Sequence, residues 1–356
     1  MKMQKRDLIL FGVVLAVTLA ALAVANQVLD NYMMRILNLC GIYIILALSM
    51  NLINGFTGLF SLGHAGFMAV GAYVAVLFTL TPQQKEMNFF LQPIQPLLLK
   101  LSLPEPLGFP VALLMGGLAA GLLAWVIGAP ILRLKDDYLA IATLGFSEII
   151  RVVFTNTQNI TNGALGLKGI KGFTNIWWSW GLAIATIIFM VFLIQSSYGR
   201  ALKAIREDEI AAESMGINVF KHKTLSFVIG CTLAGVGGGL LAHLIGTIDP
   251  MMFRFVLTFN ILLIVVLGGI GSITGNVVAA IVVTVLMEQM RFLDQAINLG
   301  FMETPAIPGL RMVVFSVMLM AVILWYPKGL MGQSEFSWQK LLSGQLFKKS
   351  KLKKSA

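Results

Sequence analysis

The chain has 356 residues, of which 58% are hydrophobic and only 12% are charged, and its formal net charge is +10. Soluble globular domains carry about 25% charged residues, so this chain, with a mean hydropathy of +0.86, has too few polar side chains to cover a water-facing surface. The composition therefore excludes a soluble domain. Its long apolar runs do not alternate polar and apolar residues, which favours helices over strands, and we predict an all-α polytopic membrane protein.

Ten apolar runs are predicted to cross the membrane, because a helix of about 17 to 25 apolar residues spans the hydrocarbon core. They are residues 8–28, 34–53, 61–80, 110–132, 138–155, 176–195, 225–247, 254–272, 275–292 and 308–326. The first run follows Lys2, Lys5 and Arg6 and ends in Ala23-Val24-Ala25, which is also the pattern of a cleaved signal peptide. Its apolar stretch is longer than that of most signal peptides, so we interpret it as a retained first span.

The distribution of positive charge predicts the orientation. With a cytoplasmic N-terminus, the cytoplasmic pieces contain 17 of the 26 Lys and Arg residues, in agreement with the positive-inside rule. Ten spans then place the C-terminus in the cytoplasm too, where the lysines of "FKKSKLKKSA" meet anionic lipid. We predict a transmembrane domain over residues 1–332, which includes a cytoplasmic segment over 196–224, and a basic cytoplasmic tail over 333–356. This topology accounts for the net charge without nucleic-acid binding.

The cysteines and histidines indicate neither a disulfide framework nor a metal site. Cys40 and Cys231 lie within apolar runs, where a thiol is usually a packing residue. His64, His222 and His243 are far apart and match no zinc-ligand spacing. The chain also lacks a Gly-x-x-x-x-Gly-Lys-Ser/Thr loop, so we expect no cofactor on this subunit and expect any ATP to be hydrolysed by a partner.

Two external connections are long and could dock an external partner or act as plain tethers. They are residues 81–110, which contain six of the eleven prolines, and the Gly-rich residues 156–173. Two glycine motifs, "GFTGLFSLG" (55–63) and "GGIGSITG" (268–275), both follow a predicted span at the cytoplasmic side. They suggest a weak internal repeat, and their spacing excludes a dinucleotide-binding fingerprint.

The stretch "SSYGRALKAIREDEIAAESMGINVFKHK" (196–223) carries five Lys or Arg and four Asp or Glu residues. It reads as two short surface helices, the second beginning at an acidic cluster and ending at Gly216. We expect Ala212, Met215, Gly216 and Val219 to present a small, semi-apolar surface. The segment is either a solvated loop that helps to fix orientation or a docking element for the groove of a soluble subunit.

Several stretches carry a resemblance to a known family. "AAESMG" resembles the EAA coupling motif of ATP-binding-cassette (ABC) importer permeases, although Ile210 stands where that motif has Glu and no Leu-Pro follows. "NLINGFTGLFSLGHAGFMAVGAYVAV", "DDYLAIATLGFSEIIRVVF", "TNGALGLKGI" and "YGRALKAIREDEIAAESMGINVFKHK" together resemble the LivM-type permease subunits of branched-chain amino acid ABC importers. The resemblance covers roughly residues 36–332.

The resemblance implies an ABC importer permease fold and a heteromeric complex. Its partners would be a second related permease, two cytoplasmic ATPases and an external binding protein that delivers leucine, isoleucine or valine. The residues predicted to couple the chain to its ATPase are Arg206, Glu209, Ala212, Glu213 and Gly216.

Polar side chains at membrane depth are expected to be functional. The candidate pathway residues are Asn51, Asn54, Ser61, His64 and Glu148. The first four lie around a predicted break in the backbone, where they either line a pathway or join helices by hydrogen bonds. Glu148 with Arg151, and Glu288 with Arg291, are spaced as ion pairs on one helix face, although either pair could instead face the path or an external protein. His243 is expected to pack near the membrane interface.

The leading hypothesis is therefore a permease subunit for branched-chain amino acids. Permeases for urea or short amides are the alternative within the same class of transporter. An ion-driven secondary transporter is disfavoured because both membrane glutamates have an Arg one turn away, and a membrane enzyme is disfavoured because no catalytic motif is present.

Overall fold

The computed structural model describes residues 5–90, 92–103, 108–133, 136–294, 297–298, 303–304, 309–325 and 329–332. The predicted basic tail, 333–356, lies outside this range. The longer helices are α1 (Lys5–Val28), α2 (Asn31–Asn51), α3 (His64–Thr79), α6 (Gly108–Ile131), α7 (Asp136–Asn156), α9 (Ile176–Gln195), α12 (Val219–Ile245), α13 (Phe255–Gly268), α14 (Ile273–Gln289) and α15 (Leu310–Trp325). Each predicted apolar run overlaps one of these helices.

Shorter elements connect the long helices. They are the π-helix η1 (Leu52–Phe56), α4 (Pro82–Asn88), α5 (Pro96–Leu99), α8 (Gln158–Thr161), η2 (Gly163–Leu165), α10 (Ser197–Glu207), α11 (Glu209–Ser214), η3 (Pro250–Phe253) and η4 (Met290–Asp294). Two small antiparallel sheets pair β1 (Leu167–Lys168) with β2 (Thr247–Ile248) and β3 (Ile297–Asn298) with β4 (Glu303–Thr304).

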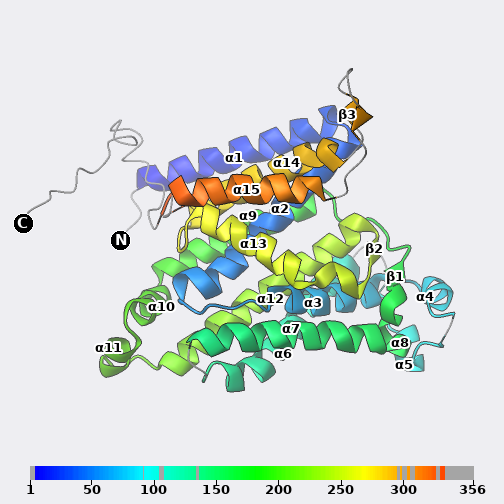
Figure 1. The fold of residues 1–356 in the computed structure, drawn as a ribbon, viewed down its shortest axis with the longest axis horizontal. Coiled ribbons are helices and arrows are strands. Elements are labelled where there is room, and N and C mark those ends of the chain that lie inside the picture. The colour runs from blue at the N-terminus through cyan, green and yellow to red at the C-terminus, as the bar shows by residue number, and fades with distance from the viewer. Residues whose placement is uncertain are drawn as a thin grey trace, which may run out of the picture.

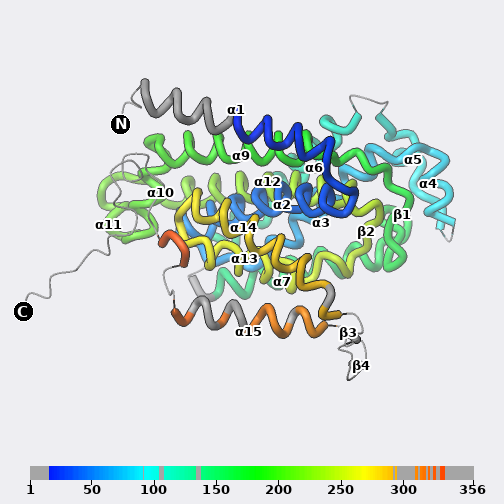
Figure 2. Tube along the Cα trace, turned by 90° about the horizontal axis from the view of Figure 1, so that it is seen from above, coloured from blue at the N-terminus to red at the C-terminus, as the bar shows by residue number. Residues whose placement is uncertain are grey.

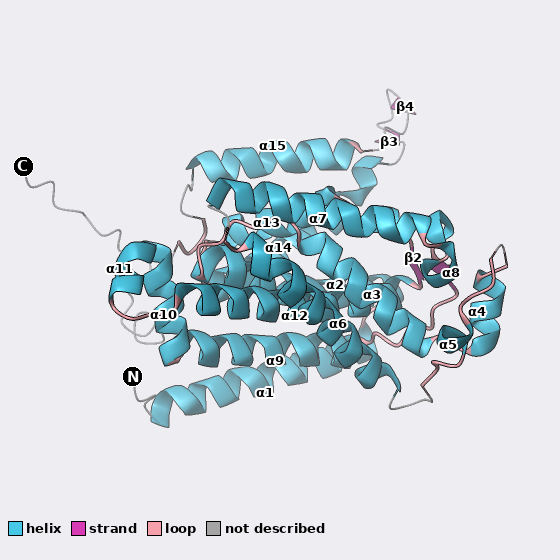
Figure 3. Ribbon diagram, turned by 90° about the horizontal axis from the view of Figure 1, so that it is seen from below, coloured by secondary structure: helices cyan, strands magenta, loops and turns pink. Residues whose placement is uncertain are grey.

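The long helices run along one common axis, and the short elements gather at its two ends (Figure 1). The helices α10 and α11 form one end, whereas α4, α5, α8 and the β1–β2 sheet form the other (Figure 3). Within the described residues, five helical spans are long and apolar enough to cross a membrane: Asn31–Phe56, Gly108–Ile131, Tyr138–Asn156, Ile176–Gln195 and Val219–Ile245. Further apolar helices are shorter. The chain is thus a helical, polytopic membrane protein.

The centre of the bundle is formed by α2, α3 and α12, with α9 and α7 on opposite sides (Figure 2). Burial agrees, because 83% of the most apolar window of α2 is buried, against 28% for α7 and for α9. The outward faces of α7 and α9 therefore remain for lipid or for another subunit.

Small residues let the central helices approach closely, as is common in membrane proteins. A Cβ atom added to Gly116 of α6 would lie 2.5 Å from the carbonyl oxygen of Gly71 of α3. A Cβ atom added to Gly235 of α12 would lie 2.6 Å from the Cβ atom of Ala120 of α6. The glycine run over residues 235–239 thus lies at a close contact between helices. Cys40 and Cys231 are buried and free in this core.

Candidate functional site

Each helix of the segment 196–224, here called the coupling segment, begins at a side-chain cap. The Ser196 side chain accepts a hydrogen bond from the Gly199 amide, and the Asp208 side chain accepts one from the Ala211 amide at 2.9 Å. Ser and Asp are favoured caps because their oxygens satisfy amides that have no partner within the helix. The two predicted surface helices are therefore confirmed as α10 and α11, and a cap at Asp208 separates them.

Gly216 ends α11 in a Schellman motif. The Gly216 amide donates to the Glu213 carbonyl at 2.9 Å, and the Ile217 amide donates to the Ala212 carbonyl at 3.1 Å. Gly216 has a φ of +83°, a backbone conformation that residues with a Cβ atom rarely adopt. An added Cβ atom would meet open space, so the constraint at Gly216 is its backbone conformation.

The faces of α11 differ from the sequence prediction. Ala212 and Val219, predicted to be on the presented surface, are buried with Ile205 in a small apolar cluster. Met215 is exposed as predicted, at 83%, and Ile210, which was not predicted on this surface, is 79% exposed. Only one face of the six-residue helix α11 packs against α10 and α12, and Ala212 lies on that face. The outward surface is thus larger and more apolar than expected.

The charged residues of the coupling segment divide into inward and outward sets. Lys223 forms an ion pair with Glu209 at 2.5 Å, which ties α12 to α11. Arg206 turns inward and donates to the Gly55 carbonyl at 3.0 Å. Glu213 and Gly216 face solvent. Of the five predicted coupling residues, Glu213 and Gly216 are therefore free for a partner, Glu209 is half-exposed in an ion pair, and Arg206 and Ala212 contact this chain.

Tyr198 anchors α10 to the start of α12. Its hydroxyl donates to the His222 carbonyl at 2.9 Å, and its ring stacks on the His222 ring at 4.8 Å. Burial raises the pKa of Tyr198 to about 12, so the hydroxyl stays protonated and remains a donor at neutral pH. The coupling segment is consequently fixed to α12 at its beginning as well as at Lys223.

The predicted break between the second and third spans is present at residues 57–63, which follow η1 and are not helical. Asn54 donates to the Ser61 carbonyl and accepts from the Ser61 amide, both at 3.3 Å. His64 is 2.8 Å from the Ser49 hydroxyl. These side chains are engaged within the chain, as expected if they join helices rather than face an open path.

Asn51 binds the turn between α13 and α14. Its side-chain amide donates to the Ser272 carbonyl at 3.1 Å, and its oxygen accepts from the Gly271 amide at 2.8 Å. Asn51 is completely buried. It therefore ties the end of α2 to a turn 220 residues further along the chain.

Two threonines that the sequence did not single out also hold the broken segment. The Leu62 amide donates to the Thr143 hydroxyl of α7 at 3.0 Å, and the Ala65 amide donates to the Thr258 hydroxyl of α13 at 2.9 Å. Both hydroxyls satisfy amides that lack a helical partner, which is the condition for irregular backbone at membrane depth. The sequence signal that could have identified Thr143 and Thr258 is the presence of a polar residue inside an apolar run.

The two predicted ion pairs are present. Glu148 and Arg151 approach to 2.7 Å, and Glu288 and Arg291 approach to 4.0 Å. Glu148 is partly exposed and stays bound to Arg151. His243, in the last turn of α12, is fully buried: it is 2.8 Å from the Thr79 hydroxyl and meets the Phe109 ring edge-on.

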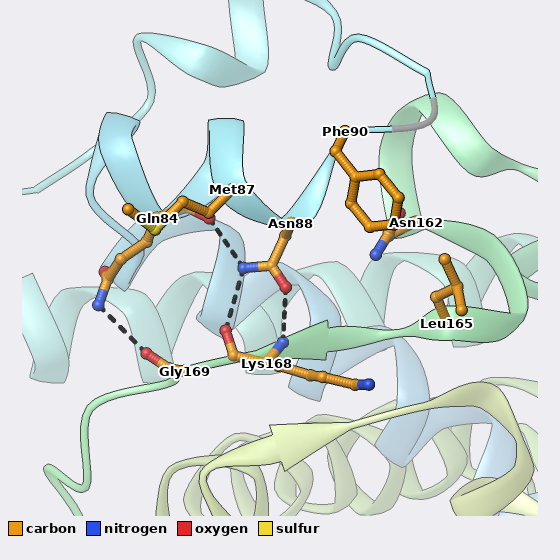
Figure 4. A pocket seen from close by; sticks show the side chains of 8 residues that line it. All are labelled: Gln84, Met87, Asn88, Phe90, Asn162, Leu165, Lys168 and Gly169. Atoms are coloured by element: carbon orange, nitrogen blue, oxygen red, sulfur yellow. Dashed lines mark hydrogen bonds between the residues drawn. The ribbon is translucent and has the colours of Figure 1, made fainter.

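At the opposite end from the coupling segment, the two long connections meet around a cavity of about 500 Å³ (Figure 4). Asn88 donates to the Lys168 carbonyl at 3.0 Å and accepts from the Lys168 amide at 2.8 Å, so its side chain pairs with β1 as a strand would. Gln84 donates to the Gly169 carbonyl at 3.1 Å. These bonds hold α4 against the second connection.

The rim of this cavity is apolar and exposed. Met87 is 77% exposed and Phe90 is 72% exposed, and Leu165 lies on the opposite side (Figure 4). The exposed Lys168 adds a positive charge. We call this surface, formed by Met87, Phe90, Leu165 and Lys168, the external face, after the side of the membrane predicted for the two long connections.

Comparison with known proteins gives a consistent result. The family model described as "Branched-chain amino acid transport system / permease component" matches residues 32–323. The high-affinity branched-chain amino acid transport system permease protein LivM of Salmonella typhimurium is 30% identical in an alignment that covers 85% of this chain and 71% of the relative. LivM of Escherichia coli is 31% identical over 82% of this chain and 68% of its own length.

A second type of permease also matches. LivH of Salmonella typhimurium is 32% identical over 152 residues, which are 43% of this chain and 45% of the relative. No solved structure matches the chain. Since the family model covers most of the sequence, this chain belongs to the family of permease components of branched-chain amino acid transport systems.

Proposed function

We propose that this chain is the permease subunit of an ATP-driven importer that moves branched-chain amino acids across the inner membrane. The observation that carries the proposal is the family match over residues 32–323. The coupling segment supports it, because it presents Ile210 and Met215 to solvent on a firmly capped helix. Large exposed apolar side chains on a rigid helix suit the groove of a soluble partner.

The proposed topology has ten spans with both termini in the cytoplasm. The charge distribution supports it, since five of the positively charged residues lie in the coupling segment and seven in the C-terminal region from residue 327. In this topology α10 and α11 are cytoplasmic and the external face is outside. The two ends of the bundle therefore meet different partners.

Three kinds of contact follow from this arrangement. The matches to both LivM and LivH proteins support a core of two related permeases. Two cytoplasmic ATPases would dock on the coupling segment and supply the ATP hydrolysis, with no cofactor on this chain. A binding protein would deliver the amino acid at the external face, where exposed Met87 and Phe90 offer an apolar contact.

Uptake in cells tests the proposal against its alternatives. The chain, expressed with its partner subunits in cells that lack branched-chain amino acid uptake, should restore uptake of radiolabelled leucine. Excess isoleucine or valine should compete with leucine, whereas urea and short amides should not. Depletion of ATP should stop uptake, and a protonophore that leaves ATP intact should not. Competition by urea, or loss with the protonophore alone, would contradict the proposal.

A further inference from the structure

Arg206 is less exposed than the other positive residues of α10, Arg200 and Lys203. Its side chain is 18% exposed, and its guanidinium donates to the Gly55 carbonyl at 3.0 Å and to the Glu207 carboxylate at 2.6 Å. Gly55 lies in η1, the π-helix that ends the second span. A side chain of the coupling segment therefore reaches the membrane helices directly.

The two glycine motifs of the sequence meet around this side chain. A Cβ atom added to Gly58 would lie 2.9 Å from Cγ of Arg206, and one added to Gly271 would lie 2.7 Å from its Nη1 atom. Both glycines have positive φ, +79° and +86°. Because Gly58 and Gly271 have no side chains, the motifs over 55–63 and 268–275 make room for the Arg206 side chain.

The end of α2 is bound to the second of these turns, and the first lies against it. Asn51 donates to the Ser272 carbonyl and accepts from the Gly271 amide, and a Cβ atom added to Gly55 would lie 2.7 Å from that amide nitrogen. The end of α2, the π-helix and the α13–α14 turn therefore form one contact region. Arg206 joins it to the coupling segment by a hydrogen bond, and Lys203 contacts it with its ammonium 5.8 Å from the centre of the Phe56 ring. π-helices interrupt the regular hydrogen bonding of a helix and often mark functional sites.

We propose that Arg206 is a positioning residue that makes the coupling segment, η1 and the α13–α14 turn move together. This inference rests on the proposed function. When the ATPases displace α10 and α11, the guanidinium carries that displacement to the end of α2 and to the start of α14. Arg206 thus acts within this chain and not as a contact to the ATPase.

The test uses the complete complex in proteoliposomes and measures leucine imported per ATP hydrolysed. In Arg206→Ala, the ATPase subunits should remain bound and hydrolysis should continue, while the ratio falls about tenfold, as expected for loss of a coupling contact. Gly271→Ala should have the same effect, because its Cβ atom displaces the guanidinium. Arg206→Lys should recover part of the ratio, since an ammonium can still donate to the Gly55 carbonyl.

Two matched controls complete the design. Arg200→Ala removes the same charge from the exposed side of α10, where Arg200 binds only the nearby Gln195 carbonyl among the described contacts. Gly309→Ala introduces the same strain at positive φ in open space. Both should keep the wild-type ratio.

Three outcomes would overturn the inference. An unchanged ratio in Arg206→Ala shows that no motion passes through this residue. Loss of the ATPase subunits from that variant shows that Arg206 is a docking contact. A wild-type complex whose uptake needs neither ATP nor the binding protein refutes the proposed function, and the relay with it.

Discussion

At the scale of single residues, Lys85 of α4 is buried without a carboxylate partner among the described contacts. Its side chain is fully inaccessible, and its ammonium donates to the Leu98 and Leu101 carbonyls at 2.7 and 2.8 Å. Burial lowers the pKa of Lys85 from its ordinary value of 10.5 to about 8. The residue thus ties α4 to α5 and to the segment that follows it, while its burial disfavours the charged form.

This lowered pKa makes the external end more stable at alkaline pH. Below about pH 8 both the folded and the unfolded chain carry the proton, so the cost of burying the charge is fully present. As the pH rises toward 10.5 the unfolded state binds more protons than the folded state, and the free energy of unfolding increases. The gain is on the order of 3 kcal/mol, from about 1.4 kcal/mol per pKa unit.

Thermal unfolding in detergent measures the effect. The melting temperature of the wild-type protein should rise between about pH 8 and about pH 10, and Lys85→Met should lack that rise. Lys100→Met, which changes an exposed lysine in the same region, should retain it. An equal rise in the Lys85 and Lys100 variants would show that Lys85 is not the titrating group.

At the scale of elements, the two ends of the bundle should bind different proteins. Replacing Ile210 with Asp removes an apolar side chain that is 79% exposed on α11 and adds a charge. Burial of such a side chain in a groove contributes about 2 kcal/mol, so the affinity for the ATPase subunit should fall about 30-fold. Binding-protein affinity should stay unchanged.

Met87→Asp is the reciprocal variant at the external face. It should weaken the affinity for the binding protein and leave the ATPase affinity as in the wild type. Pull-down of each partner with both variants measures the two effects together. If Ile210→Asp retained its ATPase, or if both variants lost the same partner, the assignment of the two ends would be wrong.

The sequence predicted elements well where local signals define them. The 176–195 run coincides with α9, and Gly216 was correctly identified as a helix end because it adopts positive φ in a Schellman motif. Helix α12 begins at Val219, six residues before the predicted span, because Asn218 caps it and its first turn is polar. Hydropathy alone does not detect a polar first turn that is continuous with an apolar helix.

The candidate site was less predictable because tertiary contacts decide it. Which face of α11 is outward depends on packing against α10 and α12, so Ala212 and Val219 were wrongly expected on the surface and the exposed Ile210 was missed, whereas Met215 was predicted correctly. The Arg206 contact with Gly55 joins residues 151 positions apart. The spacing of residues within one helix cannot predict a contact between such distant parts of the chain.

At the scale of the whole molecule, a helical bundle presents the coupling segment at one end and the external face at the other (Figure 1). The break at residues 57–63 lies between α2 and α3, two helices of the central core, and it is held by side chains from α7 and α13. Movement of the coupling segment would therefore affect helices at the centre of the bundle. Such movement of the central helices would open a path through the core to one side of the membrane and then to the other.

The most direct test of the importer function is uptake of radiolabelled leucine by proteoliposomes that contain this chain, its paired permease and the ATPase subunits. We predict uptake only when ATP is present on the ATPase side and the binding protein is present on the opposite side, with loss of uptake when either is omitted. Uptake that continues without ATP and follows an imposed ion gradient would contradict the account.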